Sequence, residues 1–135
     1  LNKIPKKLDL LKALRVFKKI QEARAKKLYG GQIHVYRAVY GVYAAKMLAE
    51  LRKEGVIKVR SQLSPFSSSK EFTEDWLKRH KAKSSIILEA IVSPEEIWYV
   101  EDPKNRFTEF EVTIFNKEPQ TYTKENIRVI RDGRE

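Results

Sequence analysis

The stretch Ser84–Val92, with the sequence Ser-Ser-Ile-Ile-Leu-Glu-Ala-Ile-Val, constrains the fold of this chain more than any other segment. It is nearly all apolar, and Glu89 is its one charged member. Strands that are buried on both faces have near-continuous apolar runs of this kind, whereas half-exposed strands alternate. The segment therefore predicts a central strand, and the chain around it must supply neighbouring strands and covering helices.

The rest of the chain predicts an α+β fold. Apolar residues at helical spacing predict a long amphipathic helix over residues 8–28, a second helix over 42–54 that ends at Gly55, and a short third helix over 70–81. β-branched and aromatic segments predict strands over 32–39, 56–63, 97–100, 109–115 and 126–130. Residues 64–69 are rich in serine and proline, which predicts a turn that caps the third helix.

Length and composition limit the classes of protein to consider. A chain of 135 residues with 41% apolar and 10% aromatic residues can form one folded domain with a real core. The absence of cysteine excludes a disulfide framework, thiolate metal sites and a cysteine nucleophile. With only two histidines, His34 and His80, a multi-histidine metal cage is not expected, and both are interpreted as bystanders.

Positive charge is concentrated at the N-terminus. Residues 1–30 carry ten basic and two acidic side chains, a balance of +8 in a chain whose net charge is +10. We expect this basic helix to pack on a domain formed by residues 31–135. Such a segment can attract nucleic acid or an acidic protein surface, or it can be a solvated helix face. No stretch has the length and apolarity of a membrane span or a signal peptide, so a soluble, cytoplasmic protein is expected.

Three further features carry chemistry. Arg37 falls on the same strand face as Ile33, Val35 and Val39, where a guanidinium is costly unless an anion meets it. A serine cluster, residues 67–69, precedes the third helix. Two carboxylates, on residues 109 and 111, are two positions apart in a predicted strand and so should share one face.

Each feature also has a structural interpretation. Arg37 can form a salt bridge with Glu89 or Glu96 within the sheet. The serines can serve only as a helix cap with turn hydroxyls. The paired carboxylates, Glu109 and Glu111, can lie on the solvent face of an edge strand, although like charges placed so closely repel mildly.

In this order, the segments Tyr36-Arg37-Ala38, 66–69 (Phe-Ser-Ser-Ser) and 108–112 (Thr-Glu-Phe-Glu-Val) resemble the mono-ADP-ribosyltransferases of the Arg-Ser-Glu type. The resemblance covers roughly residues 33–130. It implies an ADP-ribosyltransferase-like split β-sandwich, preceded by the N-terminal helix, with NAD in the cleft between two sheets. Many relatives have glycine at the position of Ala38 and threonine at that of Ser68, and the chain is short for the family.

The resemblance also implies roles for residues that would bind NAD. Arg37 would bind the diphosphate, for which a guanidinium offers a planar, charged fork. The backbone of Ala38 would hold the nicotinamide amide. Ser67 would hydrogen-bond the ribose and hold Glu111 in place, and Ser69 would support the turn. The run of three serines leaves open whether residue 67 or 68 makes the ribose contact.

The resemblance implies two catalytic carboxylates and a substrate-recognition loop. Glu111 would oppose the positive charge that develops on the ribose as the bond to nicotinamide breaks. Glu109 would position a guanidinium and take its proton, which makes arginine the expected acceptor. Phe107 and Arg106 would contact the protein substrate.

The expected function is therefore NAD-dependent mono-ADP-ribosyl transfer to a protein, with NAD as a substrate and no metal. A small viral or toxin-like enzyme would act in the cytoplasm of its own or a host cell. The alternative is a basic module that binds nucleic acid or protein and keeps an inactive ADP-ribosyltransferase-like fold. A third possibility is an NAD glycohydrolase, which transfers the ribose to water.

Overall fold

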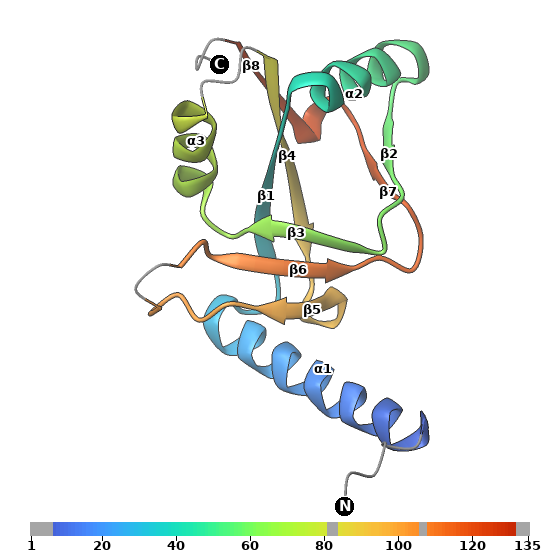
Figure 1. The fold of residues 1–135 in the computed structure, drawn as a ribbon, viewed down its shortest axis with the longest axis vertical. Helices are drawn as coiled ribbons and strands as arrows, with labels where there is room; N and C mark the ends of the chain where they lie inside the picture. The colour runs from blue at the N-terminus through green and yellow to red at the C-terminus, as the bar shows by residue number, and fades with distance from the viewer. Residues whose placement is uncertain (1–6, 81–83, 106–107, 132–135) are drawn as a thin grey trace, which may run out of the picture.

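A computed structural model describes residues 7–80, 84–105 and 108–131 of the chain (Figure 1). The helices are α1 (Lys7–Tyr29), α2 (Gly41–Glu54) and α3 (Lys70–Arg79), with short 3-10 turns η1 (Pro94–Glu96) and η2 (Lys124–Asn126). The strands are β1 (Ile33–Tyr40), β2 (Ile57–Val59), β3 (Leu63–Ser67), β4 (Ser84–Val92), β5 (Ile97–Val100), β6 (Glu111–Phe115), β7 (Gln120–Tyr122) and β8 (Ile127–Arg131). The expected α+β fold with an N-terminal helix is confirmed. Among the described residues, no helix is both long and apolar enough to cross a membrane.

The strands form an antiparallel six-stranded sheet in the order β5-β6-β3-β1-β4-β8, and β2 and β7 form a separate pair. Strand β4 lies between β1 and β8, and it pairs with β1 from Ile33↔Val92 to Tyr40↔Ser85. Its residues Ile86 and Ile87 point to opposite faces and are both fully buried. The prediction of a central strand over Ser84–Val92 is therefore confirmed.

The six-stranded sheet changes direction sharply between β1 and β3. These two strands pair only at Tyr36↔Ser67. In Figure 1, β1, β4 and β8 run upright, whereas β3, β6 and β5 run across them. The sheet thus divides into two groups of strands that cross at one residue pair, and the residues around that pair are brought together from distant parts of the sequence.

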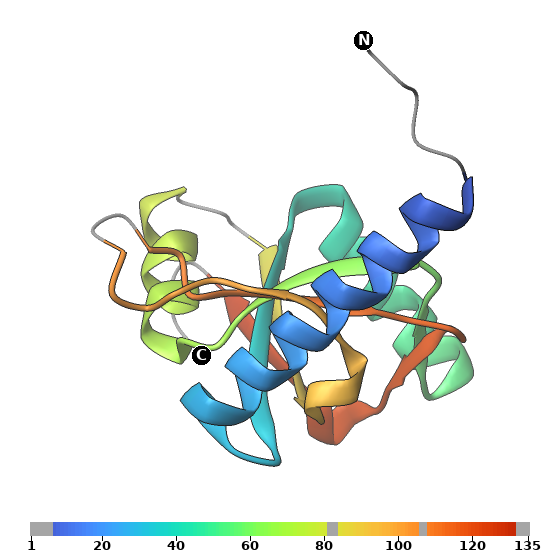
Figure 2. The ribbon, with the colours of Figure 1, turned by 90° about the horizontal axis from the view of Figure 1, so that it is seen from below.

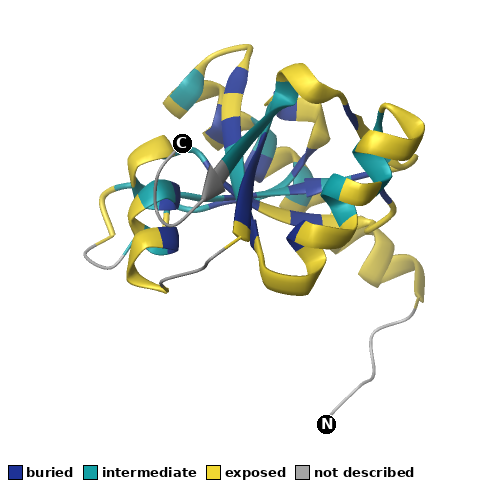
Figure 3. Ribbon diagram, turned by 90° about the horizontal axis from the view of Figure 1, so that it is seen from above, coloured by how far each residue is buried: buried dark blue, intermediate teal, exposed yellow. Residues whose placement is uncertain are grey.

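Buried side chains lie on both faces of the upright strands. The main core includes Val35 of β1, Val112 of β6 and Ala44 of α2. On the opposite face, Leu77 of α3 packs with Ile87 of β4. Figure 3 shows this burial concentrated along the strands, with the helices exposed on their outer faces.

Helix α1 packs on β5 through its C-terminal part. The rings of Phe17 and Trp98 are 5.7 Å apart, and the buried side chain of Gln21 accepts a 3.0 Å hydrogen bond from the backbone N–H of Val100. The first turns of the helix extend beyond the body of the molecule (Figures 1 and 2). Several apolar side chains of α1 are consequently exposed: Leu8, Leu10, Leu11, Leu14, Val16 and Ile20.

Two sequence predictions about the middle of the chain were wrong. The strand expected over residues 56–63 is divided between β2 and β3, which join different sheets. The turn expected over residues 64–69 is mostly strand β3. Ser64 is fully buried there and its hydroxyl accepts a hydrogen bond from Asn116, 52 residues further on, which offsets the cost of burying it. Pro65 is tolerated because β3 has only one pairing with β1 and is an edge along most of that side.

Candidate functional site

A hollow of about 250 Å³ lies where the two groups of strands cross. Five of the residues singled out in the sequence line it, namely Arg37, Ala38, Ser67, Glu109 and Glu111. The other lining residues are Tyr36, Pro65, Phe66, Phe72, Thr73 and Trp76. The two expected substrate contacts, Arg106 and Phe107, lie outside the described residues.

Arg37 is half-buried and pairs with Leu88 across the β1–β4 ladder. Neither expected partner forms an ion pair with it. The carboxylate of Glu89 lies 3.3 Å from the side chain of Arg128, and that of Glu96 accepts the backbone N–H of Ser93 at 2.8 Å. In the part of the chain that the structure describes, Arg37 has no carboxylate within salt-bridge distance, so no acidic side chain neutralises its charge. Its charge instead acts on the buried Tyr122, whose pKa it lowers against the larger, opposing effect of burial.

The three serines have three different positions. Ser67 lines the hollow, and its hydroxyl donates a 2.9 Å hydrogen bond to the carbonyl of Glu109. The hydroxyl of Ser68 instead lies 2.9 Å from that of Tyr29, at the end of α1. The structure thus places residue 67, and not residue 68, at the hollow. Ser67 and Glu111 are register partners on β3 and β6, but the hydroxyl holds the backbone of Glu109 and makes no hydrogen bond to the Glu111 carboxylate in the described chain.

Ser69 caps α3, as expected. Its hydroxyl accepts a 3.1 Å hydrogen bond from the backbone N–H of Phe72, which lies three residues later in the chain. This cap fixes the start of the helix that carries Phe72, Thr73 and Trp76 to the hollow. Sequence analysis missed all three side chains, although their spacing after a capping serine places them on one helix face.

The chain does not run straight through the carboxylate pair. Strand β6 begins at Glu111, and Phe110 has a φ of 56°, in the left-handed region that a non-glycine residue rarely adopts. The expectation that Glu109 and Glu111 project from one continuous strand is therefore wrong. Such a conformation costs on the order of 1–3 kcal/mol and persists only where surrounding contacts impose it. Both residues still line the hollow despite the turn at Phe110.

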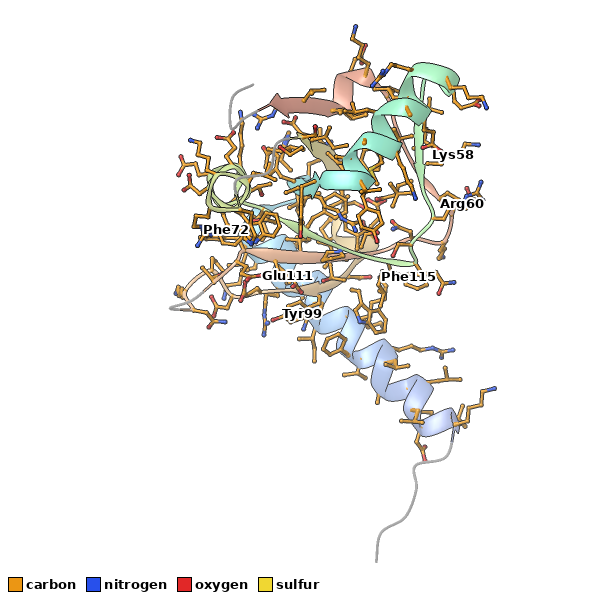
Figure 4. The ribbon with its side chains drawn as sticks, turned by 45° about the horizontal axis from the view of Figure 1, so that its top comes forward. Lys58, Arg60, Phe72, Tyr99, Glu111 and Phe115 are labelled. Carbon is orange, nitrogen blue, oxygen red and sulfur yellow. The ribbon has the colours of Figure 1, made fainter. Side chains whose placement is uncertain are left out.

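The two carboxylates differ in environment. Glu109 is exposed, whereas Glu111 is half-buried and one of its oxygens accepts a 3.0 Å hydrogen bond from the hydroxyl of Thr113. Figure 4 shows Glu111 on β6 and Phe72 on α3, which border the hollow from neighbouring elements. Glu111 thus has a fixed orientation in a hollow that the aromatic residues Phe72 and Trp76 also line. Glu109 can reach a molecule that approaches from solvent.

A third carboxylate, that of Glu101, lies behind this turn. One oxygen of Glu101 accepts hydrogen bonds from the backbone N–H groups of Glu109 (2.9 Å) and Glu111 (3.2 Å) and from the hydroxyl of Thr108 (2.9 Å). Burial acts to raise the pKa of the Glu101 carboxyl group, but these hydrogen bonds outweigh it and the pKa lies below its ordinary value. The sequence pattern gives no sign of this contact, because it joins residues seven to ten positions apart across a turn.

A second hollow, of about 480 Å³, adjoins the first at the end of β1. Arg37 and Ala38 line both hollows, and Tyr40, Tyr43 and Met47 line only the second. Among the described residues, no group of three histidine or acidic side chains is placed to hold a metal ion.

Comparisons of the chain with protein-family models, with curated proteins and with solved structures gave no match. The residues and geometry of the hollow are therefore the basis for assigning a function.

Proposed function

We propose that this protein is an NAD-dependent mono-ADP-ribosyltransferase that transfers ADP-ribose from NAD to an arginine side chain of a protein. One observation carries the proposal: Arg37, Ser67 and Glu111, from three strands, line a single hollow together with Glu109. These are the residues on which the resemblance to the Arg-Ser-Glu transferases depends. The crossing of the two groups of strands at Tyr36↔Ser67 also supports the split arrangement that the resemblance implies.

The size and lining of the two hollows fit the parts of a dinucleotide. The first hollow, at about 250 Å³, has room for the nicotinamide and its ribose, and Phe72 offers aromatic surface for a flat ring. Trp76 also lines the hollow, but its ring already stacks on that of His80, with the two centroids 3.8 Å apart. Arg37 lines both hollows, and in the proposed complex its guanidinium would pair with the diphosphate. The adenosine would then extend into the second hollow, past Ala38.

In the proposed reaction, the bond between C1′ of the ribose and the nicotinamide nitrogen breaks, and the bonding electron pair leaves with nicotinamide. Positive charge develops on the ribose, and the carboxylate of Glu111, held by Thr113, would oppose it. A guanidinium nitrogen of the acceptor arginine then bonds to C1′, and Glu109 would take the proton that this nitrogen loses. The products are ADP-ribosylated arginine, nicotinamide and a proton.

The experiment is transfer of label from NAD to protein in a cell extract. We expect labelled protein with the native chain and a 10²- to 10³-fold slower transfer with Glu111→Gln, about the cost of removing one preorganised charge-stabilising group. Glu118→Gln is the matched control, because Glu118 is exposed and does not line the first hollow. Nicotinamide release without labelled protein would indicate a glycohydrolase. Absence of both from a folded native chain would refute the proposal.

The alternative is a basic binding module with an inactive fold, and the exposure of α1 favours it. Lys12, Arg15 and Lys19 are exposed on the helix that extends beyond the body of the molecule. Such a module would bind nucleic acid or an acidic protein in a salt-dependent manner. Its binding would be weakened by Lys12→Glu and Arg15→Glu, and it would be indifferent to Glu111→Gln.

A further inference from the structure

Glu101 directly follows β5, and its side chain contacts the backbone on either side of the left-handed residue Phe110. The two N–H groups that flank this residue, those of Glu109 and Glu111, point at the same carboxylate oxygen. Successive N–H groups around a left-handed residue form a small concave site that favours an anion. Here the anion is a side chain of the chain itself.

The same turn is also held from the side of β3. The hydroxyl of Ser67 donates to the carbonyl of Glu109, and the backbone N–H of Ser68 donates to the carbonyl of Phe110 at 2.8 Å. Donors from the serine segment thus hold the carbonyl groups, and the acceptor on Glu101 holds the N–H groups. With both kinds of group bonded, the direction of each peptide unit in the turn is fixed, and with it the direction in which residues 109 and 111 project.

The contacts of Glu101 are unusual for an exposed loop. Thr108 donates its hydroxyl to the same carboxylate and accepts the N–H of Phe110 with the same oxygen atom, at 2.9 Å in each case. Within the described residues, the side chain of the neighbouring acid, Asp102, makes only a local contact, a 2.9 Å hydrogen bond from the N–H of Lys104. A carboxylate that accepts three hydrogen bonds behind a strained residue has the geometry of a support for the turn.

We infer that Glu101 is a positioning residue, whose carboxylate sets the direction of the Glu109 and Glu111 side chains by holding the backbone N–H groups of these two residues. This inference rests on the proposed function for its consequence, because the positioned groups are the proposed base and the proposed charge-stabilising carboxylate. Glu101 itself does not line the hollow, so in the proposed reaction it would not touch the reacting atoms.

The experiment compares Glu101→Ala and Glu101→Gln with Asp102→Asn in the full chain. Alanine removes the acceptor, glutamine keeps an acceptor oxygen without the charge, and Asp102→Asn neutralises the adjacent acid. The first readout is the amide proton resonances of residues 109 and 111, which a carboxylate acceptor shifts downfield. The second readout is kcat and KM for NAD in label transfer.

We expect the two amide protons to move upfield in Glu101→Ala, partly in Glu101→Gln and not at all in Asp102→Asn. We expect kcat to fall on the order of 100-fold in Glu101→Ala, because a misplacement of about 1 Å has that effect, with partial rescue in Glu101→Gln. KM for NAD should change by less than about three-fold, since Arg37, Phe72 and Trp76 still line the hollow.

Unchanged amide resonances in a folded Glu101→Ala would overturn the inference, whatever the activity. So would equal losses of activity in Glu101→Ala and Asp102→Asn, or a loss that appears only in KM. If Glu101→Ala does not fold, the same criteria apply to Glu101→Gln. If the two amide resonances differ as expected between the native chain and Glu101→Ala, but the native chain neither releases nicotinamide nor labels protein, Glu101 positions the turn and the proposed reaction is refuted.

Discussion

Replacing Gln21 with leucine tests whether α1 is an integral part of the fold. Gln21 is only 4% exposed, and its side-chain oxygen accepts the backbone N–H of Val100, a residue with no exposed surface. Leucine has a similar volume, so the packing between α1 and β5 should survive. The N–H group would lose its partner without gaining access to water, so the variant would bear the full free-energy penalty of a buried, unpaired donor.

The expected cost is about 1–3 kcal/mol of unfolding free energy, the penalty for one buried, unpaired backbone donor. For a chain of this size, the denaturant dependence in urea is about 1–3 kcal/mol per molar. The urea midpoint should therefore fall by roughly 1 M with an unchanged slope. Ile20→Ala, one position away and 52% exposed, is the control and should change the unfolding free energy by less than about 0.5 kcal/mol.

Two results would refute this reasoning. If Gln21→Leu unfolds at the urea concentration of the native chain, the contact between α1 and β5 does not contribute in solution. If Ile20→Ala costs as much as Gln21→Leu, the loss reflects helix formation in general and not the hydrogen bond to Val100.

Three further predictions concern the hollow and the core. Ser69→Ala should cost about 1 kcal/mol in unfolding free energy, measured in urea, because it removes the cap of α3, whereas Ser69→Asp should retain most of the stability. Burial raises the pKa of Tyr122 to about 12, so the neutral phenol contributes to the unfolding free energy in full below pH 10, and this contribution is lost as the pH rises from 10 through 12. Tyr122→Phe should remove that part of the alkaline destabilisation, together with the last step of tyrosinate absorbance in a pH titration. Glu109→Gln should slow transfer to arginine 10²- to 10⁴-fold but slow nicotinamide release to water much less, and equal losses would contradict the role of residue 109 as the acceptor's base.

Local pattern was sufficient to locate two elements to within a residue or two. The strand Ser84–Val92 follows from its nearly continuous apolar run, which is buried on both faces. The helix over residues 8–28 follows from the helical spacing of its apolar residues, but that spacing did not predict the buried face, because Gln21 and Ala25 are buried while Leu8 to Ile20 are largely exposed. Gly55 ends α2 in the left-handed conformation, with a φ of 76°, as a glycine after a helix predicts. The resemblance singled out four residues that line one hollow in the structure: Arg37, Ser67, Glu109 and Glu111.

The remaining features depend on contacts between distant residues. The alternation of Glu109, Phe110 and Glu111 is typical of a strand, and the left-handed turn is imposed by Ser68 and Glu101, which the local pattern does not include. The same holds for β3, where a buried serine is stable only because Asn116 reaches it from β6's end. Polar groups that satisfy one another across the fold leave no periodic trace in the sequence.

A crystal of the protein soaked with NAD tests the central claim most directly. We predict that the nicotinamide ribose lies in the first hollow, with a ribose hydroxyl within hydrogen-bond distance of the Glu111 carboxylate and the diphosphate beside Arg37. NAD bound on another surface, or in the hollow with its ribose directed away from Glu111, would contradict the account.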